Sequence, residues 1–303
     1  MKRFRNAVLI LFTVLLILLS VTGCDKKEDD PLKGVKVSYL GPAGTYTEEA
    51  TEFFFPEAGT LIPEETVEKA VEKLIEGKAD YAVIPQENTI GGAVTNYVDV
   101  LLAHEDVFVV GEVILPISQT LMGVEGATLE DIKTVCSHAQ GIAQSEEWRK
   151  EHLPGAVTQE MSSTAAADSY VAEKGDKSIA AVSAPGAAKL YGLTVLAENV
   201  QITEANKTRF YVLSTSALEG KKLTRAVFSA TCEAGMIDDI IVEIHKSGLE
   251  LVTIHDRPEG SQLGKYNYII EVEYEKGITV KQTDKIGALE GVHFYGCFDV
   301  KGK

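Results

Sequence analysis

The chain has 303 residues, of which 45% are hydrophobic and 24% are charged, so its composition is that of a globular protein. The length predicts about two domains. The formal net charge of −16 argues against a nucleic-acid partner, because neutralising phosphates requires a surface rich in Lys and Arg.

Residues 1–23 are predicted to be a bacterial lipoprotein signal peptide. A basic start precedes the apolar run Ala7–Val21, which is short for a membrane span. The run ends in Val21-Thr22-Gly23-Cys24, which resembles a lipobox. Cys24 is therefore expected to be lipidated and to anchor the protein on the extracytoplasmic face of the cell membrane; an uncleaved anchor helix is the alternative. The charged residues 24–33 are expected to form a solvated tether.

The cysteines predict no metal site. Cys24, Cys136, Cys232 and Cys297 show neither Cys-x-x-Cys spacing nor a His pair at metal-ligand intervals. If Cys24 is acylated, at least one of the others stays unpaired even in an oxidising compartment. We expect these cysteines to be buried as small apolar side chains.

Residues 34–213 are predicted to form an α/β domain of two lobes with a cleft between them. Strands are expected at Val35–Leu40, Tyr81–Pro85, Val107–Leu115, Gln119–Val124, Thr134–Ser137 and Ile179–Ser183. Helices are expected from Thr45 or Thr47 to Phe55, over Val67–Ile75, from Gln140 to about His152, over Ala165–Glu173, and up to Tyr191. Strand–loop–helix alternation favours this class, and ligands bind where strands end, as at residues 86–92.

Residues 221–303 are predicted to form a smaller ferredoxin-like domain. Strands are expected at Leu223–Ala230, Leu249–Asp256, Tyr266–Tyr274 and Val292–Val300, and helices at Ile237–Lys246 and Asp284–Gly291. This order is βαββαβ, which is typical of regulatory domains of the ACT type.

Five segments, in order and at matching spacing, resemble the prephenate dehydratase family and span most of residues 37–210. They are Gly41-Pro42-Ala43-Gly44-Thr45-Tyr46-Thr47, Pro85-Gln86-Glu87-Asn88-Thr89-Ile90-Gly91-Gly92-Ala93-Val94, Ser137-His138-Ala139-Gln140 with Ala143-Gln144, Ser162-Ser163-Thr164-Ala165-Ala166, and Asn206-Lys207-Thr208-Arg209-Phe210. Two of the segments depart from the family pattern: Thr89 stands for the usual Ser and Gly91 for a common acid in one, and Ala139 stands for the usual Pro in the other.

The resemblance implies conversion of prephenate to phenylpyruvate in phenylalanine biosynthesis, with loss of carbon dioxide and the ring hydroxyl. It also implies lobes of the type II periplasmic-binding-protein kind, and neither a cofactor nor a metal. Thr208 is expected to donate a hydrogen bond to the leaving hydroxyl, because a held O–H donor stabilises developing charge. Arg209 is expected to bind a substrate carboxylate with its planar fork.

The other expected site residues lie in the same five segments. Glu87 and Asn88 are expected to assist catalysis, Glu87 by orienting Thr208 and Asn88 by hydrogen-bonding the ring. Substrate-binding roles are expected for Thr45, Thr89, Ser162, Ser163, Thr164, Asn206, Phe210 and His138. Simple N-capping is an alternative for the Ser162-Ser163-Thr164 segment, and a contact between the lobes is an alternative for His138.

The C-terminal domain keeps part of the family's regulatory pattern. Gly235-Met236-Ile237 stands for the usual Gly-Ala-Leu, and His255-Asp256-Arg257-Pro258 for the usual Glu-Ser-Arg-Pro. Gly235, Arg257 and Pro258 are thus candidate regulatory residues for bound phenylalanine. A purely structural dimerisation role is the alternative, and a homodimer or tetramer is expected.

Two rival functions remain open at this point. Export favours a non-enzymatic lipoprotein that binds a small aromatic or amino-acid anion, since bilobal α/β lipoproteins deliver such ligands to transporters. Arogenate dehydratase differs from prephenate dehydratase only by an amino group on the substrate. The Thr208-Arg209 pair favours catalysis over binding alone.

Overall fold

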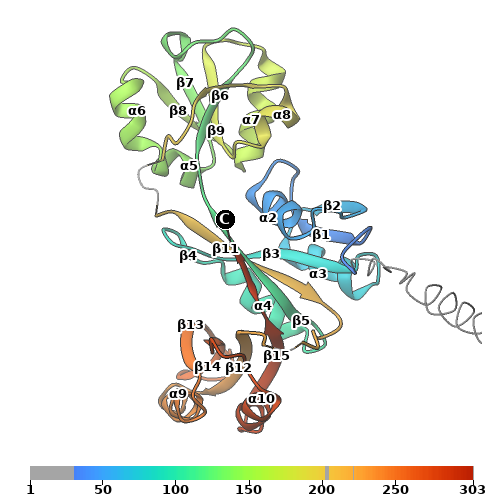
Figure 1. Ribbon diagram of the computed structural model, residues 1–303. Helices are drawn as coiled ribbons and strands as arrows, with labels where there is room; N and C mark the ends of the chain where they lie inside the picture. Colours follow the sequence, from blue (N-terminus) through green and yellow to red (C-terminus); the bar gives the residue numbers. More distant parts are fainter. Residues whose placement is uncertain (1–30, 202–204, 221, 303) are drawn as a thin grey trace, which may run out of the picture. The chain divides into compact units, whose positions relative to one another are not determined.

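The computed structural model describes residues 31–201, 205–220 and 222–302 (Figure 1). The predicted signal peptide and Cys24 lie outside the described residues. The chain divides into Met1–Lys33 and Gly34–Lys303, and the second unit contains three β-sheets. No described helix combines the length and the apolarity needed to cross a bilayer.

The first sheet forms what we call the first lobe, with strand order β16-β5-β11-β3-β1-β2 and β4 beside β3. Its strands are β1 (Lys36–Leu40), β2 (Thr60–Glu64), β3 (Tyr81–Asn88), β4 (Gly92–Ala93), β5 (Phe108–Pro116), β11 (Lys207–Ser214) and β16 (Val300–Gly302). Its helices are α2 (Tyr46–Phe54), α3 (Val67–Ile75) and α4 (Thr95–Ala103). The central strand β11 runs antiparallel to both β3 and β5, whereas β1 is parallel to β2 and β3.

The second sheet forms the second lobe, with strand order β10-β6-β9-β7-β8. The strands are β6 (Thr120–Gly123), β7 (Thr134–Ser137), β8 (Val157–Glu160), β9 (Ile179–Ser183) and β10 (Thr194–Ala197). The helices are α5 (Ala139–Gln144), α6 (Glu146–His152), α7 (Thr164–Lys174) and α8 (Ala187–Tyr191), with a short 3-10 turn at Leu129–Asp131. The chain passes between the lobes twice, before β6 and before β11.

The third sheet is antiparallel and has the order β13-β14-β12-β15; we call it the C-terminal sheet. Its elements are β12 (Arg225–Glu233), a 3-10 turn (Ala234–Met236), α9 (Ile237–Lys246), β13 (Glu250–Pro258), β14 (Lys265–Glu273), α10 (Val280–Gly287) and β15 (Val292–Phe298). One face packs on α9 and α10. The other face shares a core with the first lobe, in which Val227 and Ile269 join Tyr97 and Tyr211.

The helices form where local signals coincide with a buried stripe. In α3, Thr66 accepts a hydrogen bond from the Lys69 N–H as the N-cap, and Val67, Ala70, Val71 and Leu74 are buried. This i, i+3, i+4, i+7 spacing places the apolar side chains on one helical face. Full burial of each larger one contributes about 1.5–3 kcal/mol.

The α/β class predicted from the sequence is confirmed. The bounds of several elements differ from prediction, however. The strand at Tyr81 continues through Asn88, because Glu87 and Asn88 pair with β11 instead of forming a loop. The helix expected to reach His152 is interrupted at Ser145, whose hydroxyl donates to the Gly141 carbonyl and accepts from Arg149. The last helix begins at Val280, because Thr279 and Gln282 form a capping box there.

Some elements were not predicted at all. Among them are β2, β4, α4, β8, β10, the central strand β11 and the terminal strand β16. The chain does not end with the C-terminal sheet, because β16 returns to the first lobe and pairs parallel with β5. Cys136 and Cys232 are buried and unpaired as expected, while the unpaired Cys297 is only partly buried.

Candidate active site

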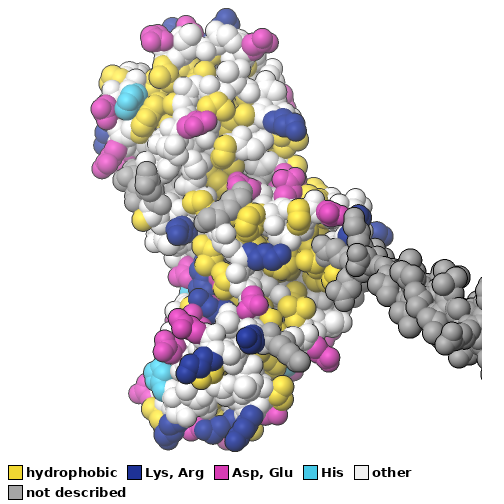
Figure 2. Space-filling view, in the orientation of Figure 1, with side chains coloured by type: hydrophobic (Ala, Val, Ile, Leu, Met, Phe, Trp, Pro, Cys, Tyr) yellow, Lys and Arg dark blue, Asp and Glu magenta, His cyan; other side chains and the backbone are white. Residues whose placement is uncertain are grey.

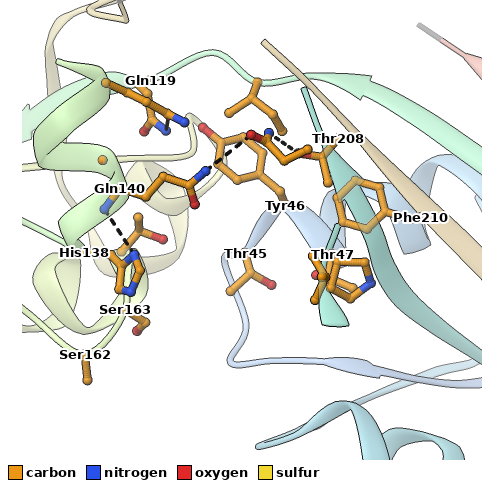
Figure 3. A pocket seen from close by; sticks show the side chains of 17 residues that line it. Thr45, Tyr46, Thr47, Gln119, His138, Gln140, Ser162, Ser163, Thr208 and Phe210 are labelled. Atoms are coloured by element: carbon orange, nitrogen blue, oxygen red, sulfur yellow. Dashed lines mark hydrogen bonds between the residues drawn. The ribbon is translucent and has the colours of Figure 1, made fainter. Parts of the chain in front are cut away.

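Both lobes contribute to one cavity of about 320 Å³ (Figure 3). Its lining residues are Thr45, Tyr46, Thr47, Pro85, Asn88, Val94, Ile117, Gln119, His138, Gln140, Gly141, Gln144, Ser162, Ser163, Thr164, Thr208 and Phe210. Hydroxyls and amides dominate its polar surface, and the described lining contains neither Lys nor Arg. A ligand here would meet hydroxyl and amide groups together with apolar side chains such as Ile117 and Phe210.

Thr208 stands beside Asn88 in neighbouring strands. The two residues are register partners in β11 and β3. The Asn88 Nδ2 donates to Thr208 Oγ1 at 2.9 Å and to Asn206 Oδ1 at 2.8 Å. Because its oxygen accepts from Asn88, the Thr208 proton must point elsewhere, and no hydrogen bond from this hydroxyl to a described residue is present. The hydroxyl can therefore donate to a ligand in the cavity.

The orientation of the Asn88 amide is fixed by its surroundings. Its Oδ1 accepts from the backbone N–H groups of Ile90 and Gly91, at 3.0 and 2.9 Å. Gln140 Nε2 from the second lobe approaches the same oxygen at 3.3 Å. Since donors surround Oδ1, the other amide atom must be the NH₂ group that faces Thr208.

Three helices begin at the cavity. Thr45 caps α2, His138 caps α5 and Ser163 caps α7, each by accepting a backbone N–H. The first N–H groups of a helix have no intrahelical acceptor and carry partial positive charge. Helix starts of this kind favour carboxylates and phosphates.

The start of α7 is better suited to an anion than the start of α2. The first turn of α2 contains Glu48 and Glu49, and Glu48 already accepts from the Gly44 N–H at 2.6 Å. The first turn of α7 contains no acidic residue. Ser162, Ser163 and Thr164 add hydroxyls at the same place.

Arg209 is not in the cavity lining. Its guanidinium donates to Glu112, to Glu271 at 2.5 Å and to Glu87 at 3.4 Å. Burial disfavours its charge, but Glu271 and Glu112 outweigh that effect and raise the Arg209 pKa. The prediction that Arg209 binds a substrate carboxylate is therefore corrected. Its guanidinium group binds carboxylates of the chain itself. The cause is strand alternation, which turns Arg209 away from the face that carries Thr208.

Three other expected site residues also lie off the cavity. Glu87 contacts Arg209 and lies 3.6 Å from His255 Nε2, so it does not orient Thr208 directly. Thr89 donates to the Ala205 carbonyl at 3.0 Å and accepts from the Lys207 N–H at 2.9 Å. Asn206 is fully buried behind Asn88. Thr89 and Asn206 thus support the start of β11 instead of meeting a ligand.

The remaining expected site residues, Thr45, Ser162, Ser163, Thr164, Phe210 and His138, do line the cavity together with Thr208 and Asn88. Sequence reasoning missed Tyr46, Gln119, Gln140 and Gln144. Tyr46, Gln140 and Gln144 lie within the segments that resemble the family, and this location could have identified them as site residues. The buried Gln119 donates to Gln144 Oε1 at 2.9 Å, and no motif marked it.

The expected regulatory residues lie in the C-terminal sheet and its turns. Gly235 belongs to the 3-10 turn before α9, and Pro258 ends β13. Arg257 makes a two-pronged ion pair with Asp99 of α4, with N–O distances of 2.7 and 2.6 Å. Figure 2 shows acidic and basic side chains interspersed over these elements.

Comparison with known proteins decides the family. The sequence model of the family described as prephenate dehydratase matches residues 37–217. The chain belongs to the prephenate dehydratase family. Prephenate dehydratase of Amycolatopsis methanolica is 32% identical over 243 residues, which cover 78% of this chain and 79% of the relative. The function and the lyase class predicted from the sequence are confirmed at this level.

Solved structures of the family share the fold. Prephenate dehydratase of Arthrobacter aurescens, crystallised in complex with L-Phe, is 29% identical with a TM-score of 0.78, covering 88% of this chain and 90% of the other. The enzyme of Staphylococcus aureus is 26% identical with a TM-score of 0.74, covering 87% of this chain and 100% of the other. The prephenate dehydratase fold thus extends through the C-terminal sheet.

Proposed function

We propose that the cavity binds prephenate and that Thr208 assists departure of the ring hydroxyl, yielding phenylpyruvate and carbon dioxide. The observation that carries this proposal is the Asn88–Thr208 hydrogen bond at the cavity wall of a prephenate dehydratase family member. That bond leaves the Thr208 proton available to the substrate. Neither a metal nor a cofactor is needed in this scheme.

The reaction requires only modest help from the protein. The bond between the ring and its carboxylate breaks, and its electrons form a ring double bond while the C–O bond to the hydroxyl breaks. Carbon dioxide leaves, and the departing hydroxide takes a proton to become water. A preorganised donor aimed at that oxygen is strongest where water is excluded, which suits the half-buried Thr208.

The substrate carboxylates require positive potential, and helix starts are its source in this cavity. We assign one carboxylate to the N-terminus of α7, with the hydroxyls of Ser162, Ser163 and Thr164 as additional donors. Phe210, which is 1% exposed, supplies an apolar surface for the ring. Arg209 has no part in carboxylate binding in this arrangement.

A turnover assay tests the function directly. Purified protein lacking residues 1–23 is mixed with prephenate, and phenylpyruvate is followed by its absorbance in alkali. Production of phenylpyruvate supports the proposal. Tight binding without turnover would favour the anion-binding alternative. Faster turnover of arogenate, measured by formation of its product phenylalanine, would identify the amino-bearing substrate as the natural one.

We also propose the fold types of the two lobes and of the C-terminal segment. The lobes are assigned to the type II periplasmic-binding-protein class, and the C-terminal βαββαβ segment to the ACT type, in line with the element order. A relative in complex with L-Phe supports phenylalanine as a ligand of this chain. We place the regulatory candidates Gly235, Arg257 and Pro258 in that segment, and we propose a homodimer or tetramer.

A further inference from the structure

The strand that carries Thr208 has two faces with different partners. Successive side chains of a strand point to opposite sides of its sheet. Thr208 and Phe210 line the cavity, whereas Arg209 and Tyr211 contact Glu271 of the C-terminal sheet. The segment that meets the substrate on one side therefore meets the C-terminal sheet on the other.

The contact on the second side is a group of buried charges, which we call the Glu271 cluster. It consists of Glu271 of β14, Arg209 of β11, Glu112 of β5 and Arg225 of β12. Arg209 donates to Glu112 and to Glu271, and Arg225 donates to the same Glu271 oxygen at 2.7 Å. Both carboxylate side chains are 0% exposed, and the two guanidinium side chains are 15% and 18% exposed. The formal charges of the four groups cancel.

Neutral groups complete the contact. The Tyr211 hydroxyl donates to Glu271 Oε2 at 2.6 Å, and Gln86 Nε2 donates to the Tyr211 oxygen at 2.9 Å. Gln86 is the extra residue of a β-bulge, because Arg209 pairs with Glu87 while Phe210 pairs with Pro85. Bulges re-aim side chains, and this one lets Gln86 and Glu87 both face the cluster.

Such a cluster is stable only when it is complete. Removing one partner from a buried ion pair leaves an uncompensated charge, which is far more costly than the pair itself. The backbone at Arg209 is thereby held against β5 and the C-terminal sheet. Thr208 directly precedes Arg209 in β11, so a shift of the backbone at Arg209 also shifts Thr208. Misplacement of a reacting group by about 1 Å can lower the rate about 100-fold.

We propose that Arg209 is a positioning residue, whose ion pairs with Glu112 and Glu271 hold the Thr208 hydroxyl in its catalytic orientation. The C-terminal sheet is thus part of the support of the active site, through Glu271. This inference rests on the proposed function, because its readout is the turnover of prephenate.

Two variants weaken the cluster by different amounts. Glu271→Gln removes a charge and keeps the shape, while Tyr211→Phe removes only the hydroxyl that donates to Glu271 and is the variant to rely on if the first does not fold. The control is Asp99→Asn, which removes the exposed ion pair with Arg257 between α4 and the C-terminal sheet. Among the described residues, that pair makes no hydrogen bond to β11.

We expect each folded cluster variant to lower kcat by about 2- to 30-fold, the range of coupling through packed networks, with little change in KM. The control should keep both constants. In a Thr208→Ala background, Tyr211→Phe should lower kcat no further, because it acts on kcat through Thr208. If Tyr211 had a purely structural role, Tyr211→Phe would lower kcat by the same factor with and without Thr208.

Opposite results separate the two proposals. If the unmodified chain turns over prephenate but Glu271→Gln, or Tyr211→Phe where the first variant does not fold, keeps full kcat or raises KM alone, the positioning role of the Glu271 cluster is overturned. It is also overturned if Tyr211→Phe adds its full effect to Thr208→Ala. If the unmodified chain does not turn over prephenate, the proposed function fails and the inference fails with it.

Discussion

The chemistry of the site depends on the direction of one hydrogen bond. Asn88 donates to Thr208 and not the reverse, because the Asn88 oxygen is occupied by backbone N–H donors. A threonine hydroxyl is too weak an acid to transfer its proton fully. Held in place with its own oxygen already bonded, it can still stabilise charge that develops on a leaving oxygen.

Thr208→Ala should therefore lower kcat by about 10²- to 10³-fold, the usual cost of removing one preorganised hydrogen-bond donor. Thr208→Ser is the matched control, since it keeps the hydroxyl and should retain most activity. Steady-state assays with prephenate and thermal unfolding curves provide the measurements, and the melting temperature should change little. Full activity of Thr208→Ala would remove this side chain from the mechanism.

At the scale of elements, the close approach of α5 to β7 places the glutamine side chains at the cavity. A Cβ atom at Gly141 would lie 2.2 Å from Ser137 Oγ and 3.2 Å from its Cβ. Ser137 is itself held by a 2.6 Å bond to the Val182 carbonyl. A larger residue at Gly141 must therefore displace α5, which carries Gln140 and Gln144.

We expect Gly141→Ala to lower kcat/KM for prephenate by about 10- to 100-fold, because misplaced substrate contacts are costly even at small displacement. Gly155→Ala is the control in the same lobe, since a Cβ there meets no atom within 4 Å. Equal kcat/KM values for the two variants would show that the α5 position does not matter for catalysis.

Helix α7 carries a buried carboxyl group that should make stability depend on pH. Asp168 is 0% exposed, and its Oδ1 accepts from the Ser183 hydroxyl at 2.8 Å. Burial raises the Asp168 pKa to about 7. The unfolded chain binds this proton only below about pH 4. The stability contribution is therefore complete below that pH and is lost as the pH rises through 7.

Asp168→Asn should remove this dependence. The unfolding free energy of the unmodified protein should fall between pH 5 and pH 8 relative to that of the variant, by a few kcal/mol at most, since one pKa unit corresponds to about 1.4 kcal/mol. Urea denaturation at the two pH values measures the difference. Parallel pH profiles for the two proteins would mean that Asp168 has an ordinary pKa.

For the whole molecule, we propose an export signal that ends at Cys24, a residue outside the described ones. We expect the expressed full-length chain to partition into the detergent phase and to lose residues 1–23. Cys24→Ala should abolish lipid labelling at this position. If the unmodified chain keeps its full mass and stays in the membrane fraction, residues 1–23 act as an uncleaved anchor instead.

Local sequence determined the family, the α/β class and much of the cavity wall. The sequence predicts helix caps such as Ser163, and it identifies the Thr208 segment, because each pattern consists of residues only a few positions apart. The strand Thr134–Ser137 and the helix Ile237–Lys246 were predicted with the observed bounds for the same reason. Motif order then tied these local segments to one family.

Only the tertiary structure decided which face of β11 meets which partner. An arginine beside Thr208 is a suitable residue for binding a substrate carboxylate. Its actual partners, Glu112 and Glu271, lie 97 and 62 residues away in the sequence. Strand register and the bulge at Gln86 bring them together, and neither is encoded within a short window. The return of β16 to the first sheet is decided in the same way, by long-range pairing rather than by local preference.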